Sequence, residues 1–289
     1  MRRLAWLALA LMLGACAKTG VQVPKAPSIA PEAPLADSIT SALWRMDETG
    51  TTRVADAGPF RLNGTAGVDT RTDFGRYRSS RTFTRSVNSF VHVPYNPALE
   101  SRRGLTVEAW VNVTEYGLFE LVPIVSRWSP VPNEQSWLLG IVGRKLNIAI
   151  VGYDSPGLFN SYATGVPSGR LLFMFQPEHA AAPVAWPSTS TIPAARWVHV
   201  AATVDGEVVK IYIDGRLDAQ YATMGVVRSS TAPLVIGNAF DERRLTDFGG
   251  DLRWDPSQDQ NPYYAFVGSI DEVRISSLAR NAFDSARLR

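Results

Sequence analysis

Residues 241–264 gather the residue types that bind sugars or cations. They include six acidic and four large aromatic residues: Asp241, Glu242, Asp247, Asp251, Asp255 and Asp259, with Phe248, Trp254, Tyr263 and Tyr264. Aromatic faces stack on sugar rings and carboxylates accept hydrogen bonds from hydroxyls, so the segment predicts a glycan-binding edge. The predicted ligand-binding residues are Trp254, Asp251, Asp255, Tyr263 and Tyr264. The acids lack EF-hand spacing. The alternatives are another calcium-binding arrangement, or a solvated loop with aromatic side chains packed beneath it.

Asp271 is the most informative single carboxylate. In a strand over residues 266–275, strict alternation places Asp271 on the same face as Val273 and Ile275. If the two apolar residues face the core, the carboxylate does too. Because burial of an unpaired charge is strongly unfavourable, the group then needs a cation, an arginine or backbone amide donors.

Other catalytic chemistry has little support in the sequence. The histidines are His92, His179 and His199, and a three-histidine zinc site would need all of them from distant segments. His199 fits a structural role within its strand. The chain contains neither a Gly-x-Ser-x-Gly nucleophile elbow nor a phosphate-binding loop.

The elements that position these residues are predicted to be β-strands. Residues 105–113 alternate strictly between apolar and polar side chains, which is typical of a half-buried antiparallel strand. Residues 145–151 continue the pattern. No long apolar stripe with helical period occurs, so the fold class is predicted to be all-β, an antiparallel two-sheet sandwich.

Two Asp-Gly pairs predict consecutive hairpins. Residues 197–204 and 207–213 are joined by Asp205-Gly206, and Asp214-Gly215 leads into a third strand from Arg216. Asp-Gly between alternating runs is a strong hairpin signal, because both turn residues must accept positive φ.

The strand sequences together resemble laminin G-like jelly rolls of the concanavalin A-like lectin/glucanase superfamily. The matching stretches occur in the family's order: residues 42–48, 105–111, 197–215, 233–238 and 266–275, then Ala279-Arg280. The resemblance covers residues 39–289 and implies a jelly roll. Two long connections, residues 154–192 and 241–264, depart from the family pattern, and such loops are usually functional or mobile.

The resemblance also implies a structural calcium ion. Related jelly rolls hold calcium with the aspartate equivalent to Asp271 and main-chain oxygens from the N-terminal region. By the same resemblance, Asp47 and the turn at Asn63-Gly64 are added as ligands. Calcium takes six to eight oxygen ligands, including carbonyls. The alternative is that Asp271 accepts hydrogen bonds from backbone amides.

Glycoside hydrolases of the same superfamily commonly align paired carboxylates on one strand, as in Glu-x-Asp-x-x-Glu. No such spacing occurs here, and the adjacent pair Asp271-Glu272 is predicted to face opposite sides. The sequence therefore favours a binding module over an enzyme.

The N-terminus has the features of an export signal. Arg2 and Arg3 precede an apolar run, residues 4–13, that is too short for a permanent transmembrane helix. Residues 13–16, Leu-Gly-Ala-Cys, resemble a bacterial lipobox, which implies cleavage after residue 15 and acylation of Cys16, the only cysteine. Ala17, rather than aspartate, resembles outer-membrane sorting if the source is Gram-negative.

Residues 16–38 carry four spaced prolines and predict an extended tether between the lipid anchor and the domain. The chain has 29 Lys and Arg against 27 Asp and Glu, and loss of Arg2 and Arg3 leaves 27 of each. A formally neutral mature protein offers no electrostatic case for binding nucleic acid.

The sequence thus predicts an exported, envelope-anchored module that recognises a glycan or a protein through its sandwich loops. A polysaccharide-cleaving enzyme with an unrecognised carboxylate set, or a structural envelope protein without a small ligand, are the alternatives.

Overall fold

The computed structural model describes residues 33–117, 121–131, 133–144, 163, 165–258 and 264–283. The chain divides into two units, residues 1–30 and 31–289, and all described residues belong to the second. The predicted signal peptide, Cys16, most of the tether and the strand predicted at 145–151 lie outside the described residues. Within these ranges, no helix has the length and apolar character needed to cross a membrane.

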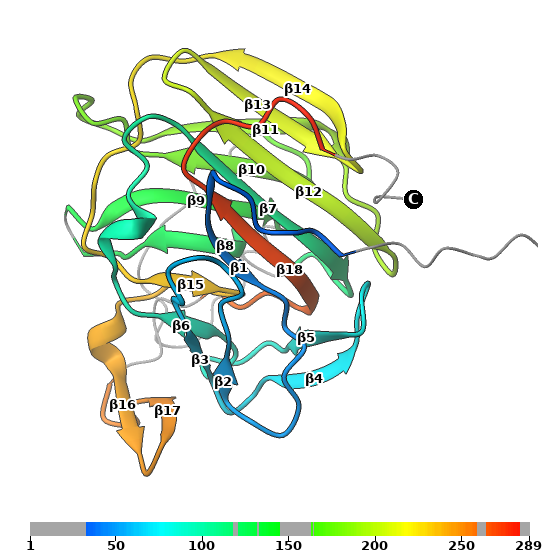
Figure 1. Ribbon diagram of the computed structural model, residues 1–289, viewed down its shortest axis with the longest axis vertical. Helices are drawn as coiled ribbons and strands as arrows, with labels where there is room; N and C mark the ends of the chain where they lie inside the picture. The colour runs from blue at the N-terminus through cyan, green and yellow to red at the C-terminus, as the bar shows by residue number, and fades with distance from the viewer. Residues whose placement is uncertain are drawn as a thin grey trace, which may run out of the picture. The chain divides into compact units, whose positions relative to one another are not determined.

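Two large antiparallel sheets form the domain, as predicted (Figure 1). Sheet A has the order β14-β13-β12-β7-β18-β5-β4, with β1 also paired to β18. Its strands are β1 (Thr40–Trp44), β4 (Arg71–Phe74), β5 (Ser79–Phe83), β7 (Leu105–Val113), β12 (Trp197–Val204), β13 (Val208–Ile213), β14 (Arg216–Ala222) and β18 (Gly268–Ser276).

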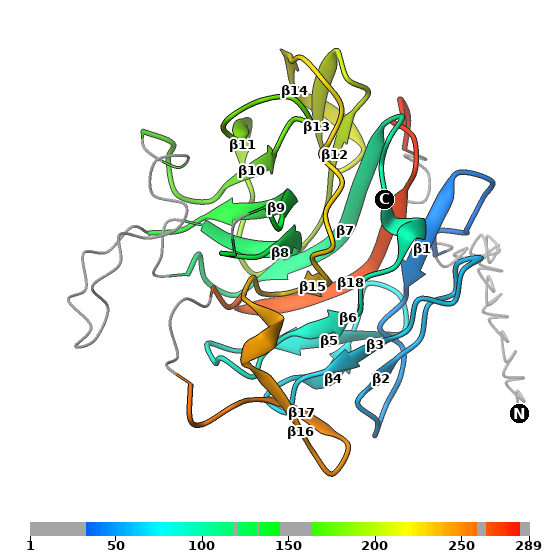
Figure 2. The same ribbon diagram turned by 90° about the vertical axis from the view of Figure 1, so that its left-hand side faces the viewer.

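Sheet B has the order β11-β10-β9-β8-β15-β6-β3-β2 (Figure 2). Its strands are β2 (Arg53–Val54), β3 (Gly64–Ala66), β6 (Val91–Val93), β8 (Leu121–Trp128), β9 (Gln135–Val142), β10 (Arg170–Phe175), β11 (Val184–Thr191) and β15 (Leu234–Ile236). Two 3₁₀ turns, η1 (Pro97–Leu99) and η2 (Glu242–Arg244), and a separate hairpin of β16 (Leu245–Phe248) and β17 (Asp251–Trp254) complete the described elements.

The predicted hairpins are confirmed. β12, β13 and β14 pair consecutively. The Asp214-Gly215 turn has φ values of 48° and 72°, whereas at Asp205-Gly206 only Gly206 has a positive φ. Residues 154–192, treated from the sequence as a long connection, instead contain β10 and β11, which extend sheet B by a hairpin.

The main core lies between the two sheets. Its largest fully buried members are aromatic: Trp44, Trp137, Phe83, Phe173, Phe175 and Phe266. β7 contributes Val107, Ala109 and Val111 to this core, as alternation predicts. The opposite face of β7 was expected to be exposed, but Glu108 and Trp110 are only 2% exposed, because other segments cover it.

A β-bulge at Glu272 changes the alternation of β18. The register with β7 shifts between Asp271 and Arg274, and Glu272 has a φ of 49°. One extra residue lets Ile270 before the bulge and Val273 and Ile275 after it all enter the core.

The bulge corrects the predicted orientation of Asp271. Asp271 lies opposite Trp110, and Arg274 opposite Glu108. Directly paired residues share one face of a sheet, so Asp271 points to the outer face of sheet A, away from Val273 and Ile275. The predicted orientation was wrong because a strictly alternating pattern does not allow for an inserted residue.

Asp271 is nevertheless fully buried, because residues 75–78 cover it. Its Oδ2 accepts a hydrogen bond from the Tyr77 amide at 3.0 Å. Burial raises the pKa of Asp271 to about 7, against the opposing effect of the Tyr77 and Arg76 amides. Burial likewise raises the pKa of Glu272 to about 8, although its ion pair with Arg45 at 3.2 Å acts the other way.

Asp56 organises the turn that contains Asn63-Gly64. Its buried carboxylate accepts hydrogen bonds from the amides of Leu43 at 2.8 Å, Gly58 at 2.6 Å and Leu62 at 2.7 Å. The Asn63 side-chain oxygen in turn accepts a hydrogen bond from the Asp56 amide at 3.0 Å. These bonds fasten the segment after β2 to β1.

The β16–β17 hairpin packs on the sandwich through Trp254. This side chain is 4% exposed and contacts Phe240 edge-to-face, with ring centroids 5.7 Å apart. Phe90 lies against Phe240 in the same cluster. The Trp254 amide donates to Asn88 at 2.7 Å, which fixes the base of the hairpin.

The two raised pKa values predict pH-dependent stability. A carboxyl whose folded pKa lies above its unfolded value stabilises the fold fully below the unfolded pKa and loses that contribution as pH rises through the folded pKa. Stability should therefore fall between pH 4 and pH 8, by about 1.4 kcal/mol per pKa unit of difference. Urea unfolding across this range should show a weaker fall for Asp271→Asn and Glu272→Gln. Asp73→Asn, an exposed control, should keep the parent profile; identical profiles for all variants would contradict the assignment.

Trp254→Ala should destabilise the protein, because it opens a cavity beneath the hairpin. We expect a loss of about 3 kcal/mol in the free energy of unfolding, measured with guanidinium chloride. Phe248→Ala, at a half-exposed position on the same hairpin, should change stability by less than about 1 kcal/mol. An unchanged stability for Trp254→Ala would contradict the buried packing role and favour the ligand-binding role predicted from the sequence.

Candidate functional site

Two aromatic residues of the predicted glycan-binding edge are buried. Trp254 is 4% exposed and Tyr264 is 2% exposed, so neither ring offers a face to a ligand. Tyr264 belongs to a second cluster, with Trp128 and Met174. The two predictions were wrong because aromatic residues in a loop can pack beneath it. Tyr263 lies outside the described residues.

The two acids predicted to bind a ligand contact their own neighbours in the sequence. Asp251 pairs with Arg253 at 2.8 Å. Asp255 accepts hydrogen bonds from the Ser257 hydroxyl at 2.7 Å and amide at 2.8 Å, which lower its pKa. These local bonds shape the hairpin and its following turn, and they do not direct the carboxylates to a common point.

Two of the three residues predicted to bind calcium accept hydrogen bonds from backbone amides. The groups that bond Asp271 are amide donors, and Asp47 accepts the Ser79 amide at 3.1 Å. Gly64 lies in sheet B against Val91. No group of three or more His, Cys, Asp or Glu in the described ranges is placed to hold a metal. Asp271 has the amide partner of the alternative at its Oδ2, whereas its buried Oδ1 has no hydrogen-bond partner among the described residues. Calcium binding stays a prediction.

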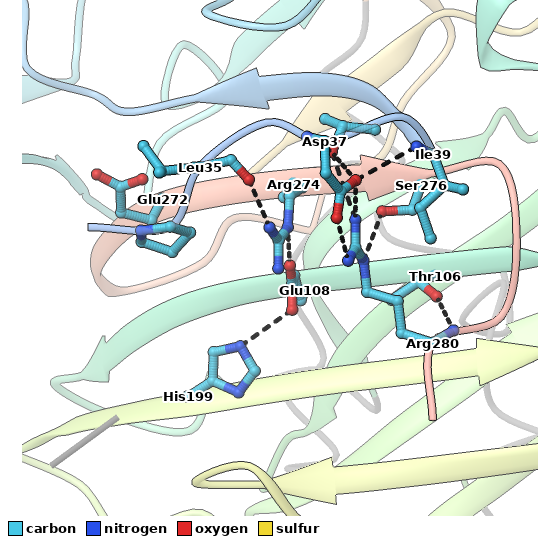
Figure 3. A network of polar contacts seen from close by, with 12 residues as sticks. Leu35, Asp37, Ile39, Thr106, Glu108, His199, Glu272, Arg274, Ser276 and Arg280 are labelled. Carbon is cyan, nitrogen blue, oxygen red and sulfur yellow. Dashed lines mark hydrogen bonds and ion pairs between the residues drawn. The ribbon is translucent and has the colours of Figure 1, made fainter. Parts of the chain in front are cut away.

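A buried charged cluster lies on the outer face of sheet A (Figure 3). Glu108 on β7 is flanked by Arg274 on β18, whose Nε donates to it, and by His199 on β12, with Nε2 at 3.3 Å. Burial alone would raise the pKa of Glu108, but hydrogen bonding and charge from His199 and Arg274 hold it below its usual value. The two neighbouring cationic groups therefore favour the ionised form of this carboxylate.

The two ends of the described chain close over this cluster. Arg274 donates to the Leu35 carbonyl at 2.8 Å, and Arg280 forms two bonds of 2.7 Å with Asp37 (Figure 3). Phe283 packs against His199, with ring centroids 5.2 Å apart. A hollow of about 300 Å³ remains. The cluster fastens both chain ends to sheet A, and His199 is buried within it beside Glu108.

A larger, open cleft of about 790 Å³ lies where η1 meets the segment before β15. Five separate segments form its walls. The polar and aromatic residues relevant to ligand binding are Tyr95, Glu100, Arg102, Arg103, Asn133 and Thr231. Tyr95 is 39% exposed, and Leu278 from the C-terminal end of the domain borders the opposite wall.

Arg127, on β8, fixes the floor of this Tyr95 cleft. Its side chain is 1% exposed and donates to the Leu99 carbonyl at 2.9 Å, to the Glu100 carboxylate at 3.1 Å and to the Ser230 carbonyl. Its guanidinium carbon also lies 5.8 Å from the centroid of the Tyr95 ring. One buried cation thereby holds two walls of the cleft in register.

The Tyr95 cleft combines an exposed ring with amide, hydroxyl and guanidinium groups on a fixed floor. Such a surface suits a polyhydroxylated ligand. Sequence analysis did not find it, because its walls come from segments far apart in the chain. The one available signal was the charged run from Glu100 to Arg103 directly before a strand.

Three solved structures illustrate the likeness of the fold. The binding domain of Paraclostridial Mosquitocidal Protein 1 has a TM-score of 0.54 at 13% identity, and that of botulinum neurotoxin serotype G has 0.55 at 13%. In both cases the match covers 86% of this chain and 50% of the other. Domain 4 of AbnA, an extracellular arabinanase from Geobacillus stearothermophilus in complex with arabinotriose, has 0.51 at 17%, covering 86% of this chain and 96% of that domain.

At these identities the likeness shows the fold alone, and the chain spans only half the length of the toxin domains. No curated protein matches the sequence significantly. A family profile, Laminin_G_3, described as the concanavalin A-like lectin/glucanases superfamily, matches residues 85–284, which is more than half of the chain. Together with the two-sheet jelly-roll architecture, this match shows that the chain belongs to the concanavalin A-like lectin/glucanases superfamily.

Proposed function

We propose that this domain is a non-catalytic glycan-binding module whose ligand lies in the Tyr95 cleft. The observation that carries the proposal is the partly exposed Tyr95 side chain beside the buried guanidinium of Arg127. The arabinotriose complex of the similar arabinanase domain supports a glycan as the class of ligand. The same fold hosts many functions, so the argument depends on the cleft and not on the fold.

The cleft offers both kinds of contact that a sugar needs. The exposed part of the Tyr95 ring provides a flat apolar surface for the C–H face of a pyranose or furanose. Asn133 and Thr231 supply hydrogen-bond donors and acceptors for hydroxyl groups at the edge of the ring. The walls are held by Arg127, so little ordering should accompany binding.

The charges of the cleft support binding without hydrolysis. Glycosidases commonly use two carboxyl groups on opposite sides of the scissile bond. Glu100 is the one carboxylate among the described residues that line the cleft, and its ion pair with Arg127 keeps it in place.

The proposal includes display at the bacterial envelope, which follows from the sequence features at Cys16. Acylation there would hold the module at a membrane, and residues 16–38 would separate it from the surface. The described chain begins at residue 33, close to the end of that tether, and Asp37 fixes it to the sandwich through Arg280. The tether therefore leads directly to a fixed attachment point.

Acylation can be tested directly in a bacterial expression host. We expect the full chain to incorporate an alkyne-tagged palmitate and to fractionate with membranes. Cys16→Ser should abolish both, while Ser28→Ala, a tether control, should change neither. Equal labelling of Cys16→Ser and the parent would contradict the anchor.

The binding role can be tested with a polysaccharide panel and calorimetry on residues 31–289. Tyr95→Ala should weaken binding at least about tenfold, since loss of the stacking surface removes roughly 1.4 kcal/mol or more. Tyr95→Phe should bind nearly as the parent does. Phe74→Ala removes a 90% exposed aromatic side chain on β4, the edge strand of sheet A, and should have no effect on binding. Absence of binding by the parent, or unchanged binding by Tyr95→Ala, would refute the proposal.

A further inference from the structure

Two adjacent arginines, Arg102 and Arg103, stand at the rim of the Tyr95 cleft. Both are exposed, and neither forms an ion pair or a side-chain hydrogen bond with the residues that the structure describes. Their guanidinium groups keep all their donors available. A guanidinium group matches the two oxygens of a carboxylate or sulfate with parallel hydrogen bonds.

Among the described residues that line the cleft, no carboxylate is left to neutralise these arginines. Glu100 is already paired with Arg127 beneath the floor at 3.1 Å. The local balance is therefore two positive charges, although the mature chain predicted from the sequence has 27 basic and 27 acidic residues. A concave wall with one sign of charge focuses the field and concentrates ligands of the opposite sign.

The backbone that carries the arginine pair is fixed at both ends. Before it, Glu100 is held by Arg127 and its amide donates to the Pro97 carbonyl at 3.1 Å. After it, Gly104 has a φ of 151°, and a Cβ atom there would lie 3.0 Å from the Val204 carbonyl oxygen. The next residue begins β7. The backbone of the two arginines is therefore held in place, while their guanidinium groups remain available to a ligand.

We infer that the glycan bound in the Tyr95 cleft is acidic, with a carboxylate or sulfate group received by Arg102 and Arg103. The inference rests on the proposed glycan-binding function and narrows its ligand class. Tyr95 supports the sugar ring, and the arginine pair binds the anionic substituent at the rim. Neutral polysaccharides then lack the charged contact and bind more weakly.

Matched pairs of polysaccharides test the inference and separate the two sources of charge. Oligogalacturonate against its methyl ester tests the carboxylate, and dextran sulfate against dextran tests the sulfate. Calorimetry should show at least tenfold tighter binding of the acidic member of one pair or both. Arg102→Gln/Arg103→Gln should remove this preference and reduce the slope of log K against log salt.

A charge-matched control separates the cleft from the net charge of the protein. Arg53→Gln/Arg71→Gln removes two exposed arginines on β2 and β4 and should retain the parent preference. An equal loss in this control, or an unchanged preference in Arg102→Gln/Arg103→Gln, would overturn the inference.

The failure of the inference differs from that of the proposed function. If each neutral polysaccharide binds as tightly as its acidic partner and Tyr95→Ala still weakens binding at least about tenfold, the glycan-binding function stands and the acidic class is wrong. If the parent protein binds neither the four polysaccharides nor any member of the wider panel, the proposed function and the inference are both refuted.

Discussion

The bulge at Glu272 is the constraint on which the arrangement of sheet A depends. Without the extra residue, Ile270 and the pair Val273 and Ile275 could not all reach the core, and β18 lies in the middle of the sheet. Their burial drives Asp271 and Arg274 to the outer face. The hydrophobic effect thus places charged groups where, in a plain two-layer sandwich, solvent would surround them. Here Asp271 is covered instead: burial raises its pKa, and the Tyr77 amide donates a hydrogen bond to its Oδ2.

The covering of this outer face determines where a ligand can bind. Glu108 lies between His199 and Arg274, and the segments at both ends of the described chain pack over these residues. Leaving one member of such a cluster unpaired would be strongly unfavourable, so the covering segments are part of the fold. The broad face of sheet A is consequently occupied, and the open Tyr95 cleft lies at the margin of the sandwich, where loops meet.

Sequence patterns predicted the regular parts of this fold because their signals are local. The alternation over β7 and the Asp-Gly turns between β12, β13 and β14 specify pairing without reference to the rest of the chain. The bulge at Glu272 carries no such signal, since an extra residue is visible only through its partner strand. Trp254 was assigned to a ligand because a loop position does not reveal whether the ring faces solvent or the core. The same limit hid the Tyr95 cleft, whose residues meet only after both sheets have formed.

Arg127 connects the stability of the domain to the shape of the cleft. A buried guanidinium needs hydrogen-bond partners. Those of the two terminal nitrogens of Arg127 come from η1, Glu100 and the segment before β15. Satisfying this one cation therefore fixes the positions of two cleft walls, as well as the carboxylate that would otherwise neutralise the rim. Arg102 and Arg103 remain unpaired at the rim because the nearby carboxylate of Glu100 pairs with the buried Arg127. The cleft can remain rigid and positively charged because its charge is balanced beneath the floor and not at the surface.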